Sequence, residues 1–230
     1  NPRLENGRYD YRVRGLGRNG EPVGIWSNAA TFDVAQNKAS HVATFGDSIT
    51  HGGGAISYSP SDWDYSYQSY LRFPTYNLGR SSDTAATSAE RFDHDVLPFQ
   101  PKHLIIMTGA NSIRAGAPAE TLIRDLSAIR DKCLLHGIRP IFLTLPPINP
   151  AAIARAFNEP TAPQWQESLL AVNEWIREQP YHIDLYPHFA DHQGLLPATL
   201  AIDGLHYDIS GKKLMAALIN AHWDELSRMW

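Results

Sequence analysis

A serine, a histidine and an aspartate in this chain are spaced so that together they could attack an acyl group. Ser48 lies in the run Gly46–Thr50, directly after the alternating apolar residues 41–45, and Asp203 precedes His206 by three residues. A carboxylate in that position can orient an imidazole through Nδ1 while Nε2 takes a proton from a serine hydroxyl. The alternative is a serine that only caps a helix and an exposed histidine beside a capping aspartate.

These residues can meet only if the elements around them form a sheet with its strand ends together. Apolar runs predict strands, and runs with helical spacing predict helices. The five strands are expected at His41–Gly46, Pro74–Leu78, His103–Thr108, Pro140–Leu145 and Tyr181–Tyr186, and helices at Thr121–His136, Gln164–Glu178 and Lys212–Met229. Their alternation indicates an α/β fold with a parallel sheet covered on both faces. Ligands bind outside the carboxyl ends of such strands, where Ser48 and the loop with His206 both lie.

An acyl-transfer site also needs hydrogen-bond donors for the negative charge that develops on the carbonyl oxygen. Groups at predicted strand ends could supply them: the backbone N–H of Ser48, the backbone N–H of Gly79 and the side-chain amide of Asn111. Taken singly, Gly79 and Asn111 could equally be ordinary turn residues. Because all three groups follow predicted strands, we expect them to lie together at one edge of the sheet and to bind the oxyanion jointly.

Four short blocks resemble, in order, those of the SGNH (GDSL-type) serine hydrolases. They are Gly46-Asp47-Ser48-Ile49-Thr50, Asn77-Leu78-Gly79-Arg80-Ser81, Gly109-Ala110-Asn111 and Asp203-Gly204-Leu205-His206. The resemblance covers about residues 41 to 220, and it implies a flavodoxin-like three-layer α/β/α fold and an esterase with no cofactor and no metal.

The same resemblance implies roles for individual residues. The implied catalytic residues are Ser48 as nucleophile, His206 as base and Asp203 as orienting acid. The implied oxyanion hole consists of Ser48, Gly79 and Asn111. The chain departs from the family pattern at Ser112, where aspartate is common, and at Ser82, where glycine is common.

Residues 1–36 differ from the rest and are expected to form a separate β-hairpin segment. Residues 9–14 and 26–34 alternate in polarity and flank a stretch rich in turn residues. The pattern resembles the last two strands of a fibronectin type III module, in which Tyr9 would lie near the tyrosine corner. Residues 37–40 are expected to be a linker, and 41–230 the hydrolase domain.

Two loops and a group of aromatic residues could contact a substrate. The loops are Gly52–Asp64 and Pro146–Pro163, and the aromatic residues are Trp63, Tyr65, Tyr67 and Tyr70. These rings could form platforms for sugars, or they could pack a helix before the second strand. Asp47 and His51 flank Ser48 and are further candidates for substrate contact, although Asp47 is well placed to bond backbone N–H groups instead.

An acetyl ester on carbohydrate is the favoured substrate. The resemblance implies it, since SGNH enzymes of similar size often remove acetyl groups from carbohydrates, and an attached β-module would suit an extracellular polymer. No Leu/Phe-rich segment predicts a tunnel for a lipid tail. A small-acyl thioesterase or lysophospholipase is the nearest alternative, and a catalytically silent glycan-binding module is an alternative of another class. The expected partner is a small-molecule or polysaccharide ester, with the oligomeric state left open.

Composition and charge exclude several other classes of protein. The net charge of −4 gives no basic footprint for nucleic acid, and the single cysteine, Cys133, excludes an internal disulfide. No run reaches the roughly 18 apolar residues of a membrane span. The histidines at 182, 188 and 192 fit no known metal-ligand spacing, so a solvated loop is favoured there.

A start at Asn1 fits removal of a signal segment, and hence an extracytoplasmic or secreted location, with the cytoplasm as the alternative.

Overall fold

The described part of the chain forms two compact units. The computed structural model describes residues 7–34, 41–52 and 63–228, and its contacts separate Asn1–Ala39 from Ser40–Trp230. The predicted linker at 37–40 and most of the predicted loop at 52–64 lie outside the described residues, apart from the ends of that loop. Each unit is described by itself.

The first unit is an antiparallel β-hairpin, as the alternating sequence predicts. Strand β1 (Gly7–Tyr11) pairs with β4 (Ala30–Val34), and the shorter β2 (Gly15–Leu16) pairs with β3 (Pro22–Val23). Apolar side chains such as that of Ile25 are exposed. A two-stranded ribbon with apolar side chains in water has little to stabilise it by itself.

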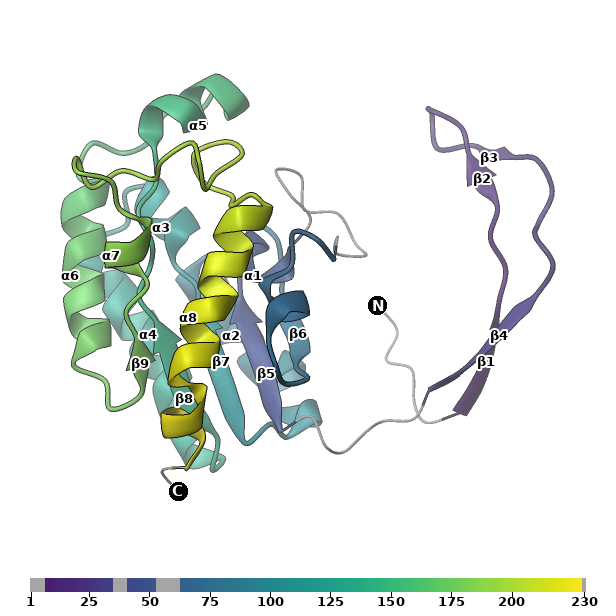
Figure 1. The fold of residues 1–230 in the computed structure, drawn as a ribbon, viewed down its shortest axis with the longest axis horizontal. Coiled ribbons are helices and arrows are strands. Elements are labelled where there is room, and N and C mark those ends of the chain that lie inside the picture. The colour runs from purple at the N-terminus through teal and green to yellow at the C-terminus, as the bar shows by residue number, and fades with distance from the viewer. Residues whose placement is uncertain (1–6, 35–40, 53–62, 229–230) are drawn as a thin grey trace. The chain divides into compact units, whose positions relative to one another are not determined.

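The second unit is built on a five-stranded parallel sheet, which confirms the predicted fold class. Its strand order is β6-β5-β7-β8-β9 (Figure 1). The strands are β5 (Val42–Gly46), β6 (Tyr76–Gly79), β7 (His103–Met107), β8 (Arg139–Leu143) and β9 (His182–Ile183). The register sets Gly46 beside both Gly79 and Met107, so three neighbouring strands end at the same edge.

Helices cover both faces of this sheet. Helices α2, α4 and α6 pack side by side on one face, whereas α8 crosses the other face beside the 3-10 turn η1 (Figure 1). The longer helices are α2 (Ala85–Asp95), α4 (Ala119–Leu135), α6 (Trp165–Arg177) and α8 (Ile209–Arg228). The shorter ones are α1 (Ser48–His51), α3 (Ala110–Arg114), α5 (Pro150–Phe157), α7 (Tyr186–Phe189), η1 (Tyr67–Tyr70) and η2 (Leu97–Phe99).

The apolar stripe of α4 shows how the predicted helices are held. Leu122, Leu126, Ile129 and Cys133 follow one another at helical spacing and are all buried. The three helices expected from such stripes, at 121–136, 164–178 and 212–229, correspond to α4, α6 and α8 and agree within a few residues.

Short elements account for most of the differences between prediction and structure. The strand expected at 181–186 ends at Ile183, because Asp184 turns to accept a hydrogen bond from Thr144 Oγ1 and α7 begins at Tyr186. The loop expected at 146–163 contains α5, whose first turn is capped by Asn149.

Two further differences concern polar and aromatic stretches. Helix α2 has mostly polar residues and buries two of them, Ser88 and Arg91, so its sequence lacks a continuous apolar stripe. It is started by the Thr84–Thr87 capping box. The aromatic stretch before β6 forms only the short turn η1 and not the longer helix weighed for it.

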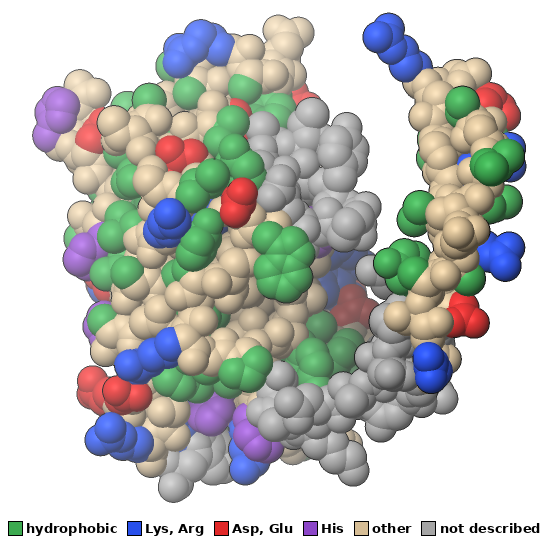
Figure 2. Space-filling view, turned by 45° about the vertical axis from the view of Figure 1, so that its right-hand side comes forward, with side chains coloured by type: hydrophobic (Ala, Val, Ile, Leu, Met, Phe, Trp, Pro, Cys, Tyr) green, Lys and Arg blue, Asp and Glu red, His purple; other side chains and the backbone are tan. Residues whose placement is uncertain are grey.

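Charged side chains on the second unit are mixed in sign. Surface ion pairs join Arg72 to Asp224 at 2.7 Å and Lys132 to Asp93 at 3.1 Å. On the face drawn in Figure 2, basic and acidic side chains likewise lie interspersed. Such a surface differs from the single-signed basic stripe of nucleic-acid-binding proteins. Among the helices that the structure describes, none is both long and apolar enough to cross a membrane.

Candidate active site

Ser48 begins helix α1 directly after the end of strand β5. The Asp47 carboxylate caps this helix by accepting the Ile49 N–H at 3.0 Å, so the capping role falls to Asp47 and not to Ser48. Gly46 is needed at the strand end, because a Cβ there would lie 2.0 Å from the Met107 carbonyl oxygen. The turn leaves Ser48 with 8% of its surface exposed, at the carboxyl edge of the sheet.

His206 and Asp203 reach Ser48 from the loop before α8. Ser48 Oγ lies 2.8 Å from His206 Nε2, and His206 Nδ1 lies 2.8 Å from Asp203 Oδ2. The other carboxylate oxygen accepts the backbone N–H groups of Leu205 at 2.9 Å and His206 at 2.7 Å. An ionised carboxylate can only accept, so Nδ1 carries the imidazole hydrogen and Nε2 can accept the one from Ser48. The structure therefore brings together the three side chains that the sequence spacing suggested.

The surroundings of Asp203 favour its ionised form. Burial raises the pKa of this carboxyl, but the hydrogen bond and charge of His206, together with the two backbone N–H groups, outweigh it and hold the pKa below its usual value. An ionised Asp203 stabilises an imidazolium when Ser48 loses its proton. This arrangement can activate a serine hydroxyl for attack on a carbonyl carbon.

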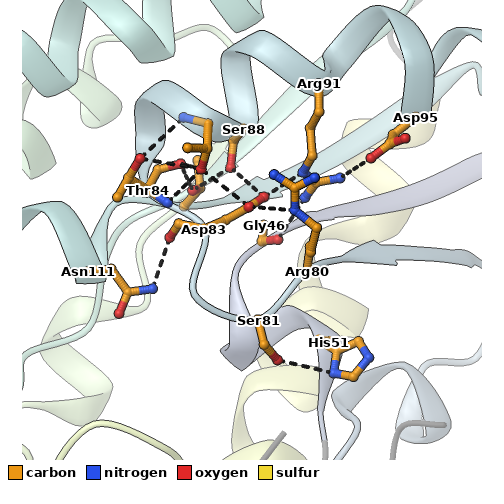
Figure 3. A network of polar contacts seen from close by, with 12 residues as sticks. Gly46, His51, Arg80, Ser81, Asp83, Thr84, Ser88, Arg91, Asp95 and Asn111 are labelled. Atoms are coloured by element: carbon orange, nitrogen blue, oxygen red, sulfur yellow. Dashed lines mark hydrogen bonds and ion pairs between the residues drawn. The ribbon is translucent and has the colours of Figure 1, made fainter. Parts of the chain in front are cut away.

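Asn111 lies beyond the end of the neighbouring strand β7, on helix α3. Its Nδ2 donates to the carbonyl oxygen of Asp83 at 2.9 Å (Figure 3). An amide nitrogen carries two hydrogens, so this bond commits one and leaves the second for a ligand. The side chain is partly exposed, as a group that contacts a ligand must be.

Gly79 differs from the prediction that its N–H binds an oxyanion. That N–H donates to Asn77 Oδ1 at 3.0 Å, so it is already occupied. The glycine is needed for another reason: a Cβ at this position would lie 2.3 Å from the backbone nitrogen of His51. Only glycine lets α1 pack so closely against the end of β6.

Ser82, which follows shortly after Gly79, has an unusual backbone conformation. Its φ is 69°, in the left-handed region that favours glycine. No described residue accepts a hydrogen bond from its N–H. The next residue, Asp83, supplies the carbonyl that holds the Asn111 amide, so Ser82 and Asn111 belong to one local assembly. The sequence signal for this position is the departure from glycine noted at Ser82.

A comparison with known protein families covers all of these residues. The sequence profile of the GDSL-like lipase/acylhydrolase family matches residues 44–214, which include Ser48, Asn111, Asp203 and His206. The chain belongs to the GDSL-like lipase/acylhydrolase family. The resemblance in the four sequence blocks is thereby confirmed.

Solved structures of GDSL-type proteins share the fold of the second unit. A lipase/acylhydrolase from Enterococcus faecalis is 23% identical with a TM-score of 0.63, over 80% of this chain and 95% of that one. A GDSL-like lipase from Bacteroides thetaiotaomicron is 19% identical with a TM-score of 0.67, over 84% and 92% of the two chains. At such identities the likeness establishes the fold, and it confirms the flavodoxin-like arrangement.

A sequence relative is an uncharacterized lipoprotein of Bacillus subtilis. It is 31% identical over an alignment of 126 residues, and the match covers 46% of this chain and 49% of the lipoprotein. The matched part of the chain thus spans about half the length of this curated relative.

Two of the predicted substrate contacts of this GDSL-type chain flank Ser48. Asp47 is only 1% exposed and its carboxylate faces the Ile49 N–H, so the structure corrects the prediction that it contacts a substrate. His51 is partly exposed, and its Nδ1 lies 3.5 Å from Ser81 Oγ (Figure 3). His51 is therefore placed where a substrate can reach it.

The aromatic residues before β6 separate into two kinds. Tyr67 is fully buried and Tyr70 packs against the core, its hydroxyl donating to the Asp64 carbonyl oxygen at 3.0 Å. Trp63 is 79% exposed and Tyr65 partly so. The packing interpretation thus holds for Tyr67 and in part for Tyr70, while Trp63 is exposed and Tyr65 and Tyr70 are partly exposed to a ligand.

Helix α5 places a ring beside the histidine. The ring centroids of Phe157 and His206 are 6.1 Å apart, with the planes at 70°. The guanidinium of Arg114, paired with Glu159 at 2.7 Å, lies 5.8 Å from the Phe157 ring centroid. Sequence reasoning treated this region as a binding loop but missed Phe157, because its contact depends on where α5 packs.

A buried lysine lies behind the serine of this GDSL-type site. Lys212 Nζ, from the first turn of α8, donates to the carbonyl oxygen of Ile49. Burial lowers the pKa of Lys212 to about 7, although the charge of Asp47 opposes the shift. Burial likewise raises the pKa of Asp47 to about 6, against the Ile49 N–H bond and the charges of His206 and Lys212. Sequence reasoning missed Lys212, since lysine at this spacing reads as a surface residue.

His182 and two carboxylates near it in sequence, Asp184 and Asp191, have protein partners of their own. His182 Nδ1 lies 2.8 Å from the Gln179 carbonyl oxygen, and Asp184 pairs with Arg177 at 2.9 Å. Asp191 accepts backbone N–H groups of its own turn. Within the residues that the structure describes, no cluster of three or more His, Cys, Asp or Glu side chains could hold a metal ion.

Proposed function

We propose that this chain is a serine esterase that removes short acyl groups, acetyl above all, from carbohydrate through an acyl-enzyme. The observation that carries the proposal is the series of contacts from Asp203 through His206 to Ser48, each of 2.8 Å. Membership of the GDSL-like lipase/acylhydrolase family supports ester hydrolysis as the reaction class.

In the proposed reaction, Ser48 Oγ attacks the ester carbonyl while His206 Nε2 takes its proton. Asp203 stabilises the imidazolium without taking the proton itself. The alcohol leaves with the proton from His206, which then activates a water molecule that releases the acid from Ser48. We expect the loss of Ser48 or His206 to reduce kcat by about 10⁴- to 10⁶-fold.

The oxyanion is proposed to bind to the N–H groups of Ser48 and Ser82 and to the second amide hydrogen of Asn111. The Ser82 N–H replaces that of Gly79 in this role, because the latter is occupied by Asn77. We expect Asn111→Ala to fold and to lose about 10²- to 10³-fold in kcat.

The preference for a short acyl group is supported by Phe157. Its ring lies beside His206 and so limits the room near the reacting carbonyl. Carbohydrate as the alcohol is supported by the exposed ring of Trp63 and the partly exposed ring of Tyr65, since aromatic faces with polar edges suit sugar rings. An extracytoplasmic location belongs to the same proposal, and the lipoprotein relative from Bacillus subtilis supports it.

The test is hydrolysis of aryl esters from acetyl to octanoyl, followed by acetate release from acetylated polysaccharides. Wild type is compared with Ser48→Ala and with Ser127→Ala, a matched serine on α4 away from the site. We expect activity that peaks at acetyl, is lost in Ser48→Ala and is kept in Ser127→Ala. A phosphonate ester should label Ser48 and inactivate the protein, as a Pseudoalteromonas esterase of similar fold is inhibited by monoethylphosphonate.

Each other outcome contradicts a different part of the proposal. A peak at longer acyl chains would favour a lipid esterase or thioesterase. Aryl acetate hydrolysis without release from any acetylated polysaccharide would remove carbohydrate as the substrate. No Ser48-dependent hydrolysis of any ester would reject the mechanism and favour a glycan-binding module.

A further inference from the structure

The carboxylate of Asp83 is the centre of a buried polar network beside the proposed oxyanion site (Figure 3). Asp83 is 2% exposed. Its Oδ1 accepts hydrogen bonds from Arg80 Nε at 2.8 Å and Thr87 Oγ1 at 3.2 Å. Its Oδ2 accepts from Arg91 Nε and, at 3.3 Å, from Ser88 Oγ. A buried carboxylate with this many donors holds the backbone of its own loop in one place.

The backbone of the same residue makes the contact to Asn111. The Asp83 carbonyl oxygen accepts from Asn111 Nδ2 at 2.9 Å, and Figure 3 shows the amide turned toward it. Fixing one amide hydrogen fixes the plane of the amide, and with it the direction of the second hydrogen. Ser82, held at φ 69°, is the residue directly before Asp83. Two of the three donors proposed for the oxyanion, the Ser82 N–H and the Asn111 amide, therefore depend on where Asp83 lies.

The partners of Asp83 connect this loop to the two central strands. Arg91 Nη2 donates to the Gly46 carbonyl oxygen at 3.0 Å, at the end of β5 and two residues before Ser48. Ser88 Oγ lies 2.9 Å from Thr108 Oγ1, just after β7. The network thus joins the three segments that carry Ser48, Ser82 and Asn111.

We propose that Asp83 is a positioning residue for the oxyanion-binding donors. It does not contact the substrate and acts through the Asn111 amide and the Ser82 N–H. The proposal rests on the proposed function, in which these donors stabilise the transition state. If the network only stabilised the fold, its substitution would lower the free energy of unfolding and leave kcat of the folded protein unchanged.

Asp95 provides a matched control on the same network. Its carboxylate pairs with Arg91 at 3.1 Å, as that of Asp83 also does, but no hydrogen bond connects it to the loop or to Asn111. Asp83→Asn and Asp95→Asn therefore remove similar charges beside one arginine. Only the first change is expected to disturb the oxyanion donors.

The experiment compares kcat and KM for an aryl acetate in these two variants, in Asn111→Ala and in the double variant Asp83→Asn/Asn111→Ala. We expect Asp83→Asn to lower kcat by about 10- to 100-fold with KM little changed, and Asp95→Asn to keep the wild-type kcat. In the Asn111→Ala background, the effect of Asp83→Asn should be much smaller, because the part that acts through the Asn111 amide is already lost and only the part that acts through the Ser82 N–H remains. Wild-type kcat in folded Asp83→Asn, or losses that multiply in the double variant, would overturn the proposal.

If Asp83→Asn does not fold, Arg80→Gln takes its place. The Arg80 side chain is half-exposed, and its replacement removes only one of the donors to Asp83 Oδ1. We expect a several-fold loss of kcat that is again smaller in the Asn111→Ala background, and no loss would overturn the proposal.

A spectroscopic measurement separates this proposal from the proposed function. Solvent exchange of the Asn111 side-chain hydrogens, followed by NMR, should become faster in Asp83→Asn but not in Asp95→Asn, with or without substrate. If wild type shows no Ser48-dependent hydrolysis, the proposed function fails and this exchange alone decides whether Asp83 positions the amide. Unchanged exchange would mean that it does not.

Discussion

The ammonium group of Lys212 is bonded to the carbonyl oxygen of Ile49, the residue that follows Ser48. Lys212 is buried, and Asp47 is the acid whose charge favours its ionised form. Lys212→Met would therefore leave the Asp47 carboxylate buried without this cation. We expect the free energy of unfolding to fall by about 3 kcal/mol, as measured by urea denaturation at pH 7.

Two variants show whether this loss comes from the charge of Asp47. In the Asp47→Asn background, Lys212→Met should cost much less, because no carboxylate is left unpaired. Lys213→Met, at the exposed neighbouring position, should leave stability within about 0.5 kcal/mol of wild type. Equal losses with and without Asp47 would show that the two groups do not interact.

Ser82→Gly is expected to stabilise the protein. A serine at φ 69° is strained, and glycine adopts this conformation without a Cβ penalty. We expect a gain of about 0.5 to 1 kcal/mol in the free energy of unfolding with kcat maintained, whereas Ser82→Val should lose about 1 to 2 kcal/mol and also lower kcat. Thermal unfolding and aryl acetate hydrolysis measure both effects. A destabilised Ser82→Gly would show that the serine side chain, and not its backbone conformation, is what this position needs.

Phe157→Ala is expected to broaden the acyl-chain preference. Removing the ring beside His206 opens space near the reacting carbonyl. We expect the ratio of kcat/KM for butyryl over acetyl ester to rise by about 10-fold. Arg155→Ala, an exposed change on the same helix, should leave the ratio as in wild type. An unchanged ratio in Phe157→Ala would remove this ring from the acyl site.

Stability is expected to fall as the pH drops from about 6.5 to about 4, in part through His103. Burial, followed by the charge of Arg139, lowers the pKa of His103 to about 4, whereas in the unfolded chain it is about 6.5. Between these values the unfolded state binds a proton that the folded state does not, so acidification favours unfolding. Asp47, with its pKa raised to about 6, acts with the opposite sign over part of this range.

The contribution of His103 to the pH dependence of stability is the difference between wild type and His103→Gln. Urea midpoints at pH 7, 5.5 and 4.5 should decline less steeply in the variant. A variant that loses stability in parallel with wild type would assign the acid sensitivity to other groups.

The sheet and the principal contact of the site could be predicted because they depend on local patterns. Buried runs such as that of β7 identify the strands. An aspartate three residues before a histidine is a weak signal alone, and it became specific only together with Ser48 at the end of a predicted strand. Parallel strands then bring Ser48 and His206 to a common edge whatever the details of the loops between them.

The rest depends on packing that sequence spacing does not report. The sequence predicted the Gly79 N–H as an oxyanion donor, and it could not show that this N–H is bonded to Asn77 Oδ1 in the folded chain. Phe157 acts through the position of α5, a short helix inside what looked like a loop. The burial of Lys212 could not be foreseen, because the Ile49 carbonyl oxygen that it contacts and the charge of Asp47 come from a distant part of the sequence.

The burial of Cys133 has a practical consequence for labelling. It is the single cysteine of the chain, it lies in the core side of α4, and burial raises the pKa of its thiol to about 12. Alkylating reagents attack thiolates, so the native protein should be inert to maleimides. A cysteine introduced at an exposed position, such as Leu135→Cys on the same helix, would then be the sole attachment point for a fluorophore or a solid support. The fold thus allows site-specific conjugation without prior removal of its own thiol.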